Sequence, residues 1–148
     1  MTFCNASSVI ELGQFIIEYV GEVITTEEYE RRCKDMRDRH KKNYYFLYLD
    51  SKRLIDAGPS GNLSRFINHS CEPNCELQKW KVIGDSRVGI FALTDLEPGD
   101  ELLFNYGPKT FEFKDSCRCG SESCYINISI EPKTSSVCQD AFTTNSRL

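Results

Sequence analysis

The stretch RFINHSCEPNC, residues 65 to 75, concentrates charged, amide and metal-binding side chains in a short segment. Arg65, Asn68, His69, Cys71 and Cys75 all lie within it. Histidine and cysteine act in proteins as metal ligands, as a catalytic base with its nucleophile, or as ordinary buried groups. The stretch is therefore a metal site, a catalytic site, or a polar turn held by a buried cysteine.

The pattern disfavours a nucleophile and base of the cysteine-protease kind. Cys71 and His69 are separated by a single residue, whereas such pairs usually come from distant segments of a prepared scaffold. A lone histidine is more often structural than catalytic. The neighbouring Asn68 and the turn-forming residues NHSCEPN nevertheless keep His69 a candidate functional residue.

Three further cysteines stand close together in the segment CRCGSESC, at Cys117, Cys119 and Cys124. Structural zinc takes four ligands in a tetrahedron, so this triplet lacks one. Cys71 is the natural fourth ligand, and it would tie this segment to the His69 loop. The alternative is three cysteines that bind no metal. The remaining cysteines, of which Cys75 is expected to be a buried thiol, show no metal-binding pattern: Cys4, Cys33, Cys75 and Cys138.

The composition indicates one intracellular domain. The chain has 148 residues, 40% of them hydrophobic, which is enough for one core. Its start lacks the basic and apolar regions of a signal peptide, and no apolar run is long enough to cross a membrane. The eight cysteines therefore indicate metal ligands and buried thiols rather than disulfides. The net charge of -4 argues against a protein that coats nucleic acid.

Short strands and one helix dominate the pattern along the chain. Thr25 and Glu28 have capping-box spacing at the start of a helix that runs to His40. Further strands are predicted within residues 14–24, 44–49 and 53–57. Residues 76–93 are predicted to form two strands around a turn at Gly84 and Asp85. This pattern predicts a mainly β (α+β) fold of several small sheets.

Two segments resemble each other within the chain. Residues 6–16, ASSVIELGQFI, align with residues 92–102, ALTDLEPGDEL, and the alignment matches Gly13 with Gly99. This similarity indicates two copies of one strand-turn-strand unit. The second copy follows the strand-like sequence RVGIF, which has no counterpart before the first copy.

The segment Glu30 to Lys42 is locally basic, with seven Lys or Arg residues and three Asp or Glu residues. The ordinary explanation is a solvated helix face whose positive charges complement the C-terminal end of the helix dipole. The other explanation is contact with DNA.

Three motifs in this order give the chain a family resemblance. RFINHSCEPNC, then GDELLFNYG (residues 99–107), then CRCGSESC (residues 117–124) resemble a SET domain with its post-SET zinc segment, and within that family the NSD group, with the Ash1 and Set2 groups close. The resemblance implies a SET-type β fold with one main helix, in which the segments around Asn68 and Tyr106 form a pseudoknot. It divides the chain into a truncated N-terminal remnant (1–8), a SET domain (9–107), a post-SET zinc segment (113–129) and a disordered tail (130–148).

The resemblance also implies an activity, the transfer of methyl groups from S-adenosylmethionine to a histone lysine. Tyr106 would be the catalytic tyrosine, and Tyr45 and Phe104 would flank the lysine channel. The cofactor pocket would be lined by Tyr45, Arg65, Phe66, Asn68 and His69. Zinc would be held by Cys71, Cys117, Cys119 and Cys124. The substrate would be the histone H3 tail in the nucleosome, at lysine 36, in the nucleus on the chromosome.

The sequence also departs from the family pattern. The glycine-containing strand that opens the family's domain, and that forms one wall of the cofactor site, is not found before Ala6. We therefore expect a fold that is truncated at its N-terminus. Two functions stay open on the sequence alone, namely a methyltransferase catalytic domain and a catalytically weak SET-like module that binds chromatin partners.

Overall fold

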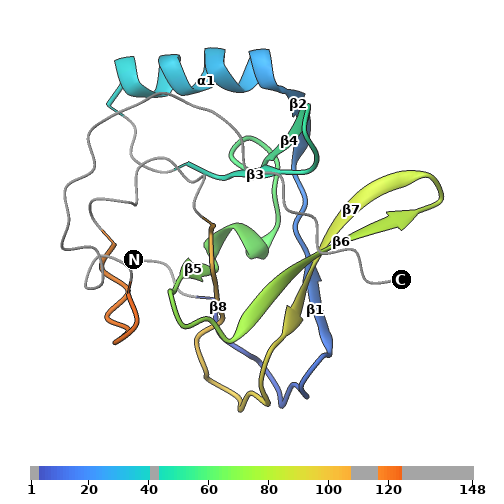
Figure 1. Ribbon diagram of the computed structural model, residues 1–148, viewed down its shortest axis with the longest axis vertical. Coiled ribbons are helices and arrows are strands. Elements are labelled where there is room, and N and C mark those ends of the chain that lie inside the picture. Colours follow the sequence, from blue (N-terminus) through green and yellow to red (C-terminus); the bar gives the residue numbers. More distant parts are fainter. Residues whose placement is uncertain (1–3, 41–43, 108–116, 125–148) are drawn as a thin grey trace.

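The computed structural model describes residues 4–40, 44–107 and 117–124 of the chain. Two small sheets, one α-helix and a short 3₁₀ helix make up the regular structure of these residues (Figure 1). This arrangement confirms the mainly β fold with one main helix. The predicted tail (130–148) lies outside the described residues, as do Lys41, Lys42 and part of the predicted zinc segment. No helix among the described residues is long and apolar enough to cross a membrane.

The smaller sheet has three antiparallel strands in the order β2-β4-β3, with bounds Glu22–Thr25, Arg53–Asp56 and Phe46–Tyr48. The central strand is buried at Leu54, Ile55 and Asp56. At the β3–β4 turn, the Asp50 carboxylate accepts hydrogen bonds from the backbone N–H groups of Lys52 and Arg53, both at 2.9 Å. The predicted hairpin is therefore confirmed, and a local aspartate closes it.

The helix α1 (Thr26–Asp38) follows β2 directly and lies against the smaller sheet (Figure 1). Thr25 is its N-cap, and the hydroxyl of Thr25 accepts a hydrogen bond from the Glu28 N–H at 3.3 Å. This bond satisfies one of the free N–H groups at the helix start, as the capping-box spacing predicted. Glu27 also hydrogen-bonds Thr25, which lowers the pKa of the Glu27 carboxyl.

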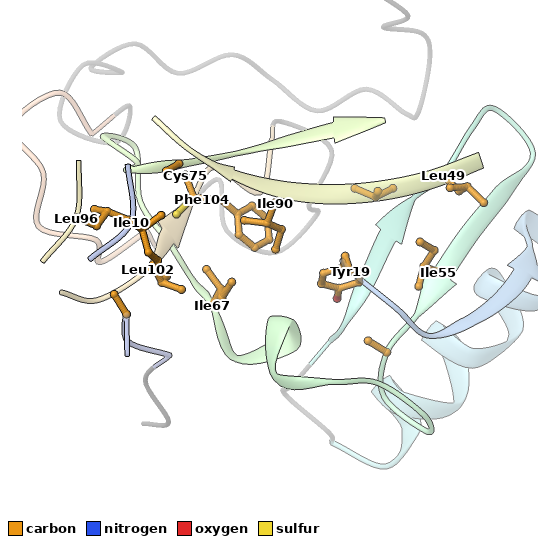
Figure 2. Close-up of a cluster of buried hydrophobic side chains, with 14 residues drawn as sticks. Ile10, Tyr19, Leu49, Ile55, Ile67, Cys75, Ile90, Leu96, Leu102 and Phe104 are labelled. Atoms are coloured by element: carbon orange, nitrogen blue, oxygen red, sulfur yellow. The ribbon is translucent and has the colours of Figure 1, made fainter. Parts of the chain in front are cut away.

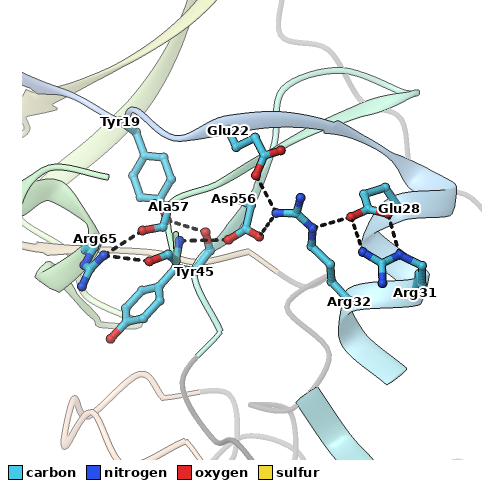
Figure 3. A network of polar contacts seen from close by, with 10 residues as sticks. Tyr19, Glu22, Glu28, Arg31, Arg32, Tyr45, Asp56, Ala57 and Arg65 are labelled. Carbon is cyan, nitrogen blue, oxygen red and sulfur yellow. Dashed lines mark hydrogen bonds and ion pairs between the residues drawn. The ribbon is translucent and has the colours of Figure 1, made fainter. Parts of the chain in front are cut away.

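One arginine joins α1 to the smaller sheet. Arg32 contacts Glu28 on its own helix at 2.7 Å, Glu22 on β2 at 2.8 Å and Asp56 on β4 at 2.7 Å (Figure 3). The Asp56 side chain is only 7% exposed, so this ion pair neutralises a carboxylate that lies almost out of water. Arg32 therefore holds the helix on the sheet through charge as well as packing.

The larger sheet has five strands in the order β1-β7-β6-β8-β5. Their bounds are Phe15–Glu18, Asp85–Ala92, Cys75–Val82, Leu103–Phe104 and Asn68–His69. β6 and β7 form the predicted hairpin, but its turn lies one residue before the predicted Gly84 and Asp85, because Asp85 already pairs with Val82. The two turn residues, Ile83 and Gly84, both have positive φ. The short 3₁₀ helix η1 (Leu63–Phe66) leads into β5.

The two similar segments of the sequence pair with each other. The Ile10 N–H donates to the Leu96 carbonyl at 3.0 Å, and the Leu96 N–H donates to the Ile10 carbonyl at 2.8 Å. The same reciprocity holds at the glycines, where Gly13 donates to Ala92 and Gly99 donates to Ala6, both at 2.9 Å. Residues 6–16 and 92–102 are therefore related by an approximate two-fold axis, and Gly13 and Gly99 each supply the positive φ that their turns require.

A core of buried apolar side chains runs from the larger sheet toward the smaller one (Figure 2). Ile67 and Ile90 are almost fully buried, and they come from segments that flank the predicted site. Other labelled members of this core are Ile10, Tyr19, Leu49, Ile55, Cys75, Leu96, Leu102 and Phe104. Burial of Cys75 agrees with its predicted role as a buried thiol.

Candidate functional site

Parallel pairing of two very short strands brings the predicted motifs together. β5 pairs with β8 so that Asn68 lies opposite Leu103 and His69 lies opposite Phe104. The Ser70 N–H continues this pairing by donating to the Phe104 carbonyl at 3.2 Å. The segments around Asn68 and Tyr106 therefore lie side by side, as the resemblance implied (Figure 1).

Side-chain amides hold the two segments in this register. Asn74 donates to the Glu101 carbonyl at 2.9 Å and accepts from the Leu103 N–H at 2.8 Å, so it uses both ends of its amide. Asn68 donates to the Glu101 carboxylate at 2.7 Å. The sequence reasoning assigned no role to Asn74 or Glu101. The only available signal was the position of Asn74 within the turn after His69.

Tyr106 is fixed at three points. Its hydroxyl donates to the Ile67 carbonyl at 2.7 Å, and its backbone N–H donates to Nδ1 of His69 at 3.2 Å. Its ring centroid lies 4.8 Å from that of Phe104 and 5.3 Å from that of His69. Burial raises the pKa of Tyr106 to about 12. The side chain is therefore a neutral phenol at physiological pH.

Arg65 contacts two aromatic rings. Its guanidinium carbon is 5.1 Å from the Tyr45 ring centroid and 4.7 Å from that of Phe66. One terminal nitrogen donates to the carbonyls of Ala57 and Gly58, at 3.0 and 3.1 Å (Figure 3). The Nε atom is buried and has no hydrogen-bond partner in the described part of the chain. A buried donor without a partner costs about 1–3 kcal/mol, so this atom fits a site that binds a ligand with an acceptor.

Tyr19 is a second buried tyrosine near this group, and the sequence reasoning missed it. Its hydroxyl donates to the Tyr45 carbonyl at 3.1 Å, and its side chain is almost completely buried. Burial raises the pKa of Tyr19, and the nearby Tyr106 raises it further. Tyr19 therefore holds the backbone of Tyr45 in place through this hydrogen bond. The signal for it was weak, because a tyrosine within a predicted strand is usually an ordinary core residue.

The four predicted zinc ligands converge. The sulfur atoms of Cys71, Cys117, Cys119 and Cys124 all lie within 4.8 Å of one another. The sulfur of Cys71 is 3.9 Å from that of Cys117 and 3.7 Å from that of Cys124. Tetrahedral zinc with Zn–S bonds of about 2.3 Å requires sulfur separations of about 3.8 Å. The cluster could therefore hold zinc as a four-thiolate site.

The cysteine segment is also tied to the rest of the site by polar contacts. Ser123 donates to the Glu72 carboxylate at 2.8 Å. Burial raises the pKa of Cys117 to about 12. Burial acts in the same direction on Cys119, but hydrogen bonds to Ser121 and other neighbours lower its pKa to about 6. Cys119 therefore offers a thiolate at neutral pH, which is the form that binds a metal.

Two other features lie apart from this site. In the basic segment, Arg31 pairs with Glu28 at 2.7 Å and Arg39 pairs with Asp35 at 2.8 Å, both largely exposed. A cavity of about 310 Å³ is lined mainly by the β1–β2 connection, β4 and the start of β7. None of its lining residues belongs to the predicted site.

Comparison with known proteins gives concordant matches. Residues 4–107 match the SET domain family. The chain is 48% identical, over 125 residues, to a mouse protein named "Histone-lysine N-methyltransferase, H3 lysine-36 specific". This alignment covers 84% of this chain and 5% of that protein. It is 47% identical, over 143 residues, to mouse histone-lysine N-methyltransferase NSD3, covering 94% of this chain and 10% of that protein.

Solved structures agree with these sequence matches. Polycomb repressive complex 2 of Chaetomium thermophilum aligns with a TM-score of 0.70 and 36% identity, over 74% of this chain and 14% of that chain. A structure of the complex bound to S-adenosylmethionine aligns with a TM-score of 0.66 and 38% identity, over 70% of this chain and 13% of that chain. The chain spans 10% or less of the length of the two mouse relatives. The family match extends over more than half of the chain, and so the chain belongs to the SET-domain family.

Proposed function

We propose that this chain carries the catalytic site of a protein-lysine methyltransferase that uses S-adenosylmethionine and modifies histone H3, with lysine 36 as the expected site. The observation that carries the proposal is the β5–β8 pairing, in which the Tyr106 backbone N–H donates to His69 and Asn68 is the neighbouring residue of the same strand. The relatives named as histone-lysine methyltransferases, one of them H3 lysine-36 specific, support the choice of substrate.

Tyr106 would orient the lysine amine rather than act as a base. With a pKa raised to about 12 by burial, it keeps its proton, and that proton is donated to the Ile67 carbonyl. The phenol oxygen would then accept an N–H of the amine. This contact would aim the nitrogen lone pair along one direction, which is the main requirement of an in-line methyl transfer.

The aromatic side chains would keep the amine neutral. Free lysine has a pKa near 10.4, so it is protonated in neutral solution. A channel formed by Tyr45, Phe104 and Tyr106 would be largely apolar, and removal from water disfavours the ammonium form. Phe104 is 5% exposed and packs on Tyr106, so it would serve as a wall of the channel.

The cofactor would be held by Tyr45, Arg65, Phe66, Asn68 and His69. S-adenosylmethionine, when bound, supplies the methyl group from its sulfonium. Arg65 fits this role, because its buried Nε has no hydrogen-bond partner among the described residues and its guanidinium contacts two rings. Asn68 bonds Glu101 through its amide nitrogen, so its amide oxygen would be the atom that offers an acceptor to the cofactor.

The four cysteines would hold a structural zinc. Their sulfur separations fit a tetrahedral ion, as described above. The ion would join residues 117–124 to Cys71 and would carry no part of the methyl transfer. Nuclear, chromosomal location follows from the proposed histone substrate.

The basic segment 30–42 is a proposed contact for nucleosomal DNA. The pairs made by Arg31 and Arg39 are exposed, and exposed ion pairs are weak, so these arginines could exchange carboxylates for phosphates. Reversing the charges of Arg37, Arg39 and Lys41 should lower nucleosome affinity and flatten its salt dependence. Unchanged affinity and salt dependence would identify the segment as a solvated helix face.

The decisive experiment is transfer of labelled methyl groups to recombinant nucleosomes by the full chain. Tyr106→Phe should lower the rate by about 100-fold, because the amine loses its orienting contact. Tyr29→Phe is the matched control, since it removes the hydroxyl of a half-buried tyrosine on α1, where it packs on Phe46. Nucleosomes with H3 lysine 36 replaced by arginine should accept no label. Cofactor binding without transfer would instead indicate a SET-like binding module.

A further inference from the structure

We propose that His69 is a positioning residue that couples the cysteine cluster to Tyr106, so that a bound metal and the tyrosine order each other. The inference rests on the proposed function for the role of Tyr106. The coupling itself can be measured without catalysis. It goes beyond a cofactor contact, because it assigns a task to both ring nitrogens of His69.

The two nitrogens of the imidazole face two different parts of the site. Nδ1 lies 3.2 Å from the backbone nitrogen of Tyr106, and Nε2 lies 3.4 Å from the sulfur of Cys71. The Tyr106 N–H can only donate, so Nδ1 is the acceptor in this contact, and the Phe104 backbone is a further hydrogen-bond partner of the ring. In the neutral ring the single proton is then on Nε2. The ring therefore donates from Nε2 to Cys71.

This hydrogen bond has a clear consequence for the metal. A cysteine that binds zinc is a thiolate, and an N–H donor to a charged acceptor makes a stronger bond than one to a neutral thiol. Contacts of this kind to metal ligands typically change metal affinity by about 10- to 100-fold. His69 would therefore hold Cys71 in the geometry of the cluster.

The same bond has a consequence for Tyr106. The backbone of His69 is fixed by pairing with β8, so the remaining freedom of the side chain is rotation about its Cα–Cβ and Cβ–Cγ bonds. A thiolate at Cys71 removes that freedom and keeps Nδ1 aimed at the Tyr106 N–H. Because binding couplings are reciprocal, any stabilisation of Tyr106 by the metal equals the stabilisation of the metal by an ordered Tyr106.

Two conservative substitutions separate the two contacts. The amide of asparagine reaches the Nδ1 position only, so His69→Asn keeps an acceptor for Tyr106 and loses the donor to Cys71. The longer glutamine places its amide at the Nε2 position, so His69→Gln keeps the donor to Cys71 and loses the acceptor for Tyr106. His40, the other histidine of the chain, is exposed at the end of α1 and gives the matched controls His40→Asn and His40→Gln.

The experiment uses the zinc-loaded full chain and two readouts that need no turnover. The first is the rate of zinc release to a chromogenic chelator. The second is hydrogen–deuterium exchange at the Tyr106 amide. His69→Asn should release zinc at least about 10-fold faster than His69→Gln. His69→Gln should instead speed exchange at Tyr106 while zinc stays bound, and both His40 variants should match the wild type.

Methyl transfer is the third readout, and it separates this inference from the proposed function. In an active chain, His69→Gln should lower kcat and leave the KM for nucleosomes unchanged. No transfer by the wild type would count against the proposed function alone, because zinc release and amide exchange would still report the coupling. Equal zinc release by the two His69 variants, or Tyr106 exchange that is indifferent to His69→Gln, would overturn the inference.

Discussion

At the scale of single residues, Ile83 occupies a backbone conformation that β-branched residues avoid. Its φ is 51°, and Gly84 follows at 87°, in the two-residue turn between the paired Val82 and Asp85. Two successive positive φ values define the type I′ turn, where asparagine followed by glycine is preferred. The Ile83 side chain is fully exposed, so no packing compensates for the strain.

Replacing this isoleucine should therefore stabilise the protein. Ile83→Asn is expected to raise the free energy of unfolding by about 1 kcal/mol, because asparagine tolerates positive φ at lower cost. Urea denaturation would measure the change. Ile83→Val is the matched control, since it keeps the β-branch and should bring no gain. An asparagine variant no more stable than the valine variant would contradict the prediction.

At the scale of elements, the attachment of α1 to the smaller sheet depends on Arg32 much more than on its neighbour Arg31. Both arginines contact Glu28, but only Arg32 reaches the buried Asp56. Arg32→Ala should destabilise the fold by about 3 kcal/mol, because it leaves a buried carboxylate without its charged partner. Arg31→Ala should cost less than about 1 kcal/mol, as for other exposed pairs. Thermal unfolding of the two variants compares them directly, and equal losses would refute this assignment.

The ion pairs of Glu28 with Arg31 and Arg32 should make stability depend on pH. Hydrogen bonds from Arg31 and then Arg32 lower the pKa of Glu28 from its ordinary 4.5 to about 2. A lowered pKa in the folded state stabilises the protein above pH 4.5, and this contribution is lost as the pH falls from about 4.5 toward about 2. Unfolding measured across this range should show a steeper decline for the wild type than for Glu28→Gln. Parallel curves would show that this carboxylate does not contribute.

Local elements were predictable from the sequence, whereas the pairing that builds the site was not. The helix with its Thr25 cap and both hairpins follow from signals that act over a few residues. β5 and β8 have two residues each, too few to show any alternation of apolar and polar side chains. The meeting of these two segments was expected only from the family resemblance, which implied a pseudoknot, and their parallel pairing was not predicted. Asn74 and Tyr19 were missed because their partners are set by tertiary contacts and not by sequence spacing.

At the scale of the whole molecule, the cysteine cluster joins residues 117–124 to the body of the domain. Loss of one ligand should release the metal, because three thiolates cannot complete a tetrahedron. Cys71→Ser should therefore reduce bound zinc well below one equivalent after a chelator wash, as measured by atomic emission. Cys33→Ser is the control, since Cys33 is buried on α1 and lies outside the cluster. Full zinc content in the Cys71 variant would contradict the four-cysteine assignment.

The reciprocal pairing of residues 6–16 with residues 92–102 also sets the order in which the chain can fold. The Asn5 side chain bonds the Gly99 carbonyl across 94 positions, and the neighbouring backbone bonds span similar distances. Contacts so far apart in sequence form late and slow the search for the native state. During synthesis, the first copy leaves the ribosome well before its partner exists. Its unpaired backbone is then exposed, and a nascent chain that stalls before residue 92 would be a natural client for chaperones.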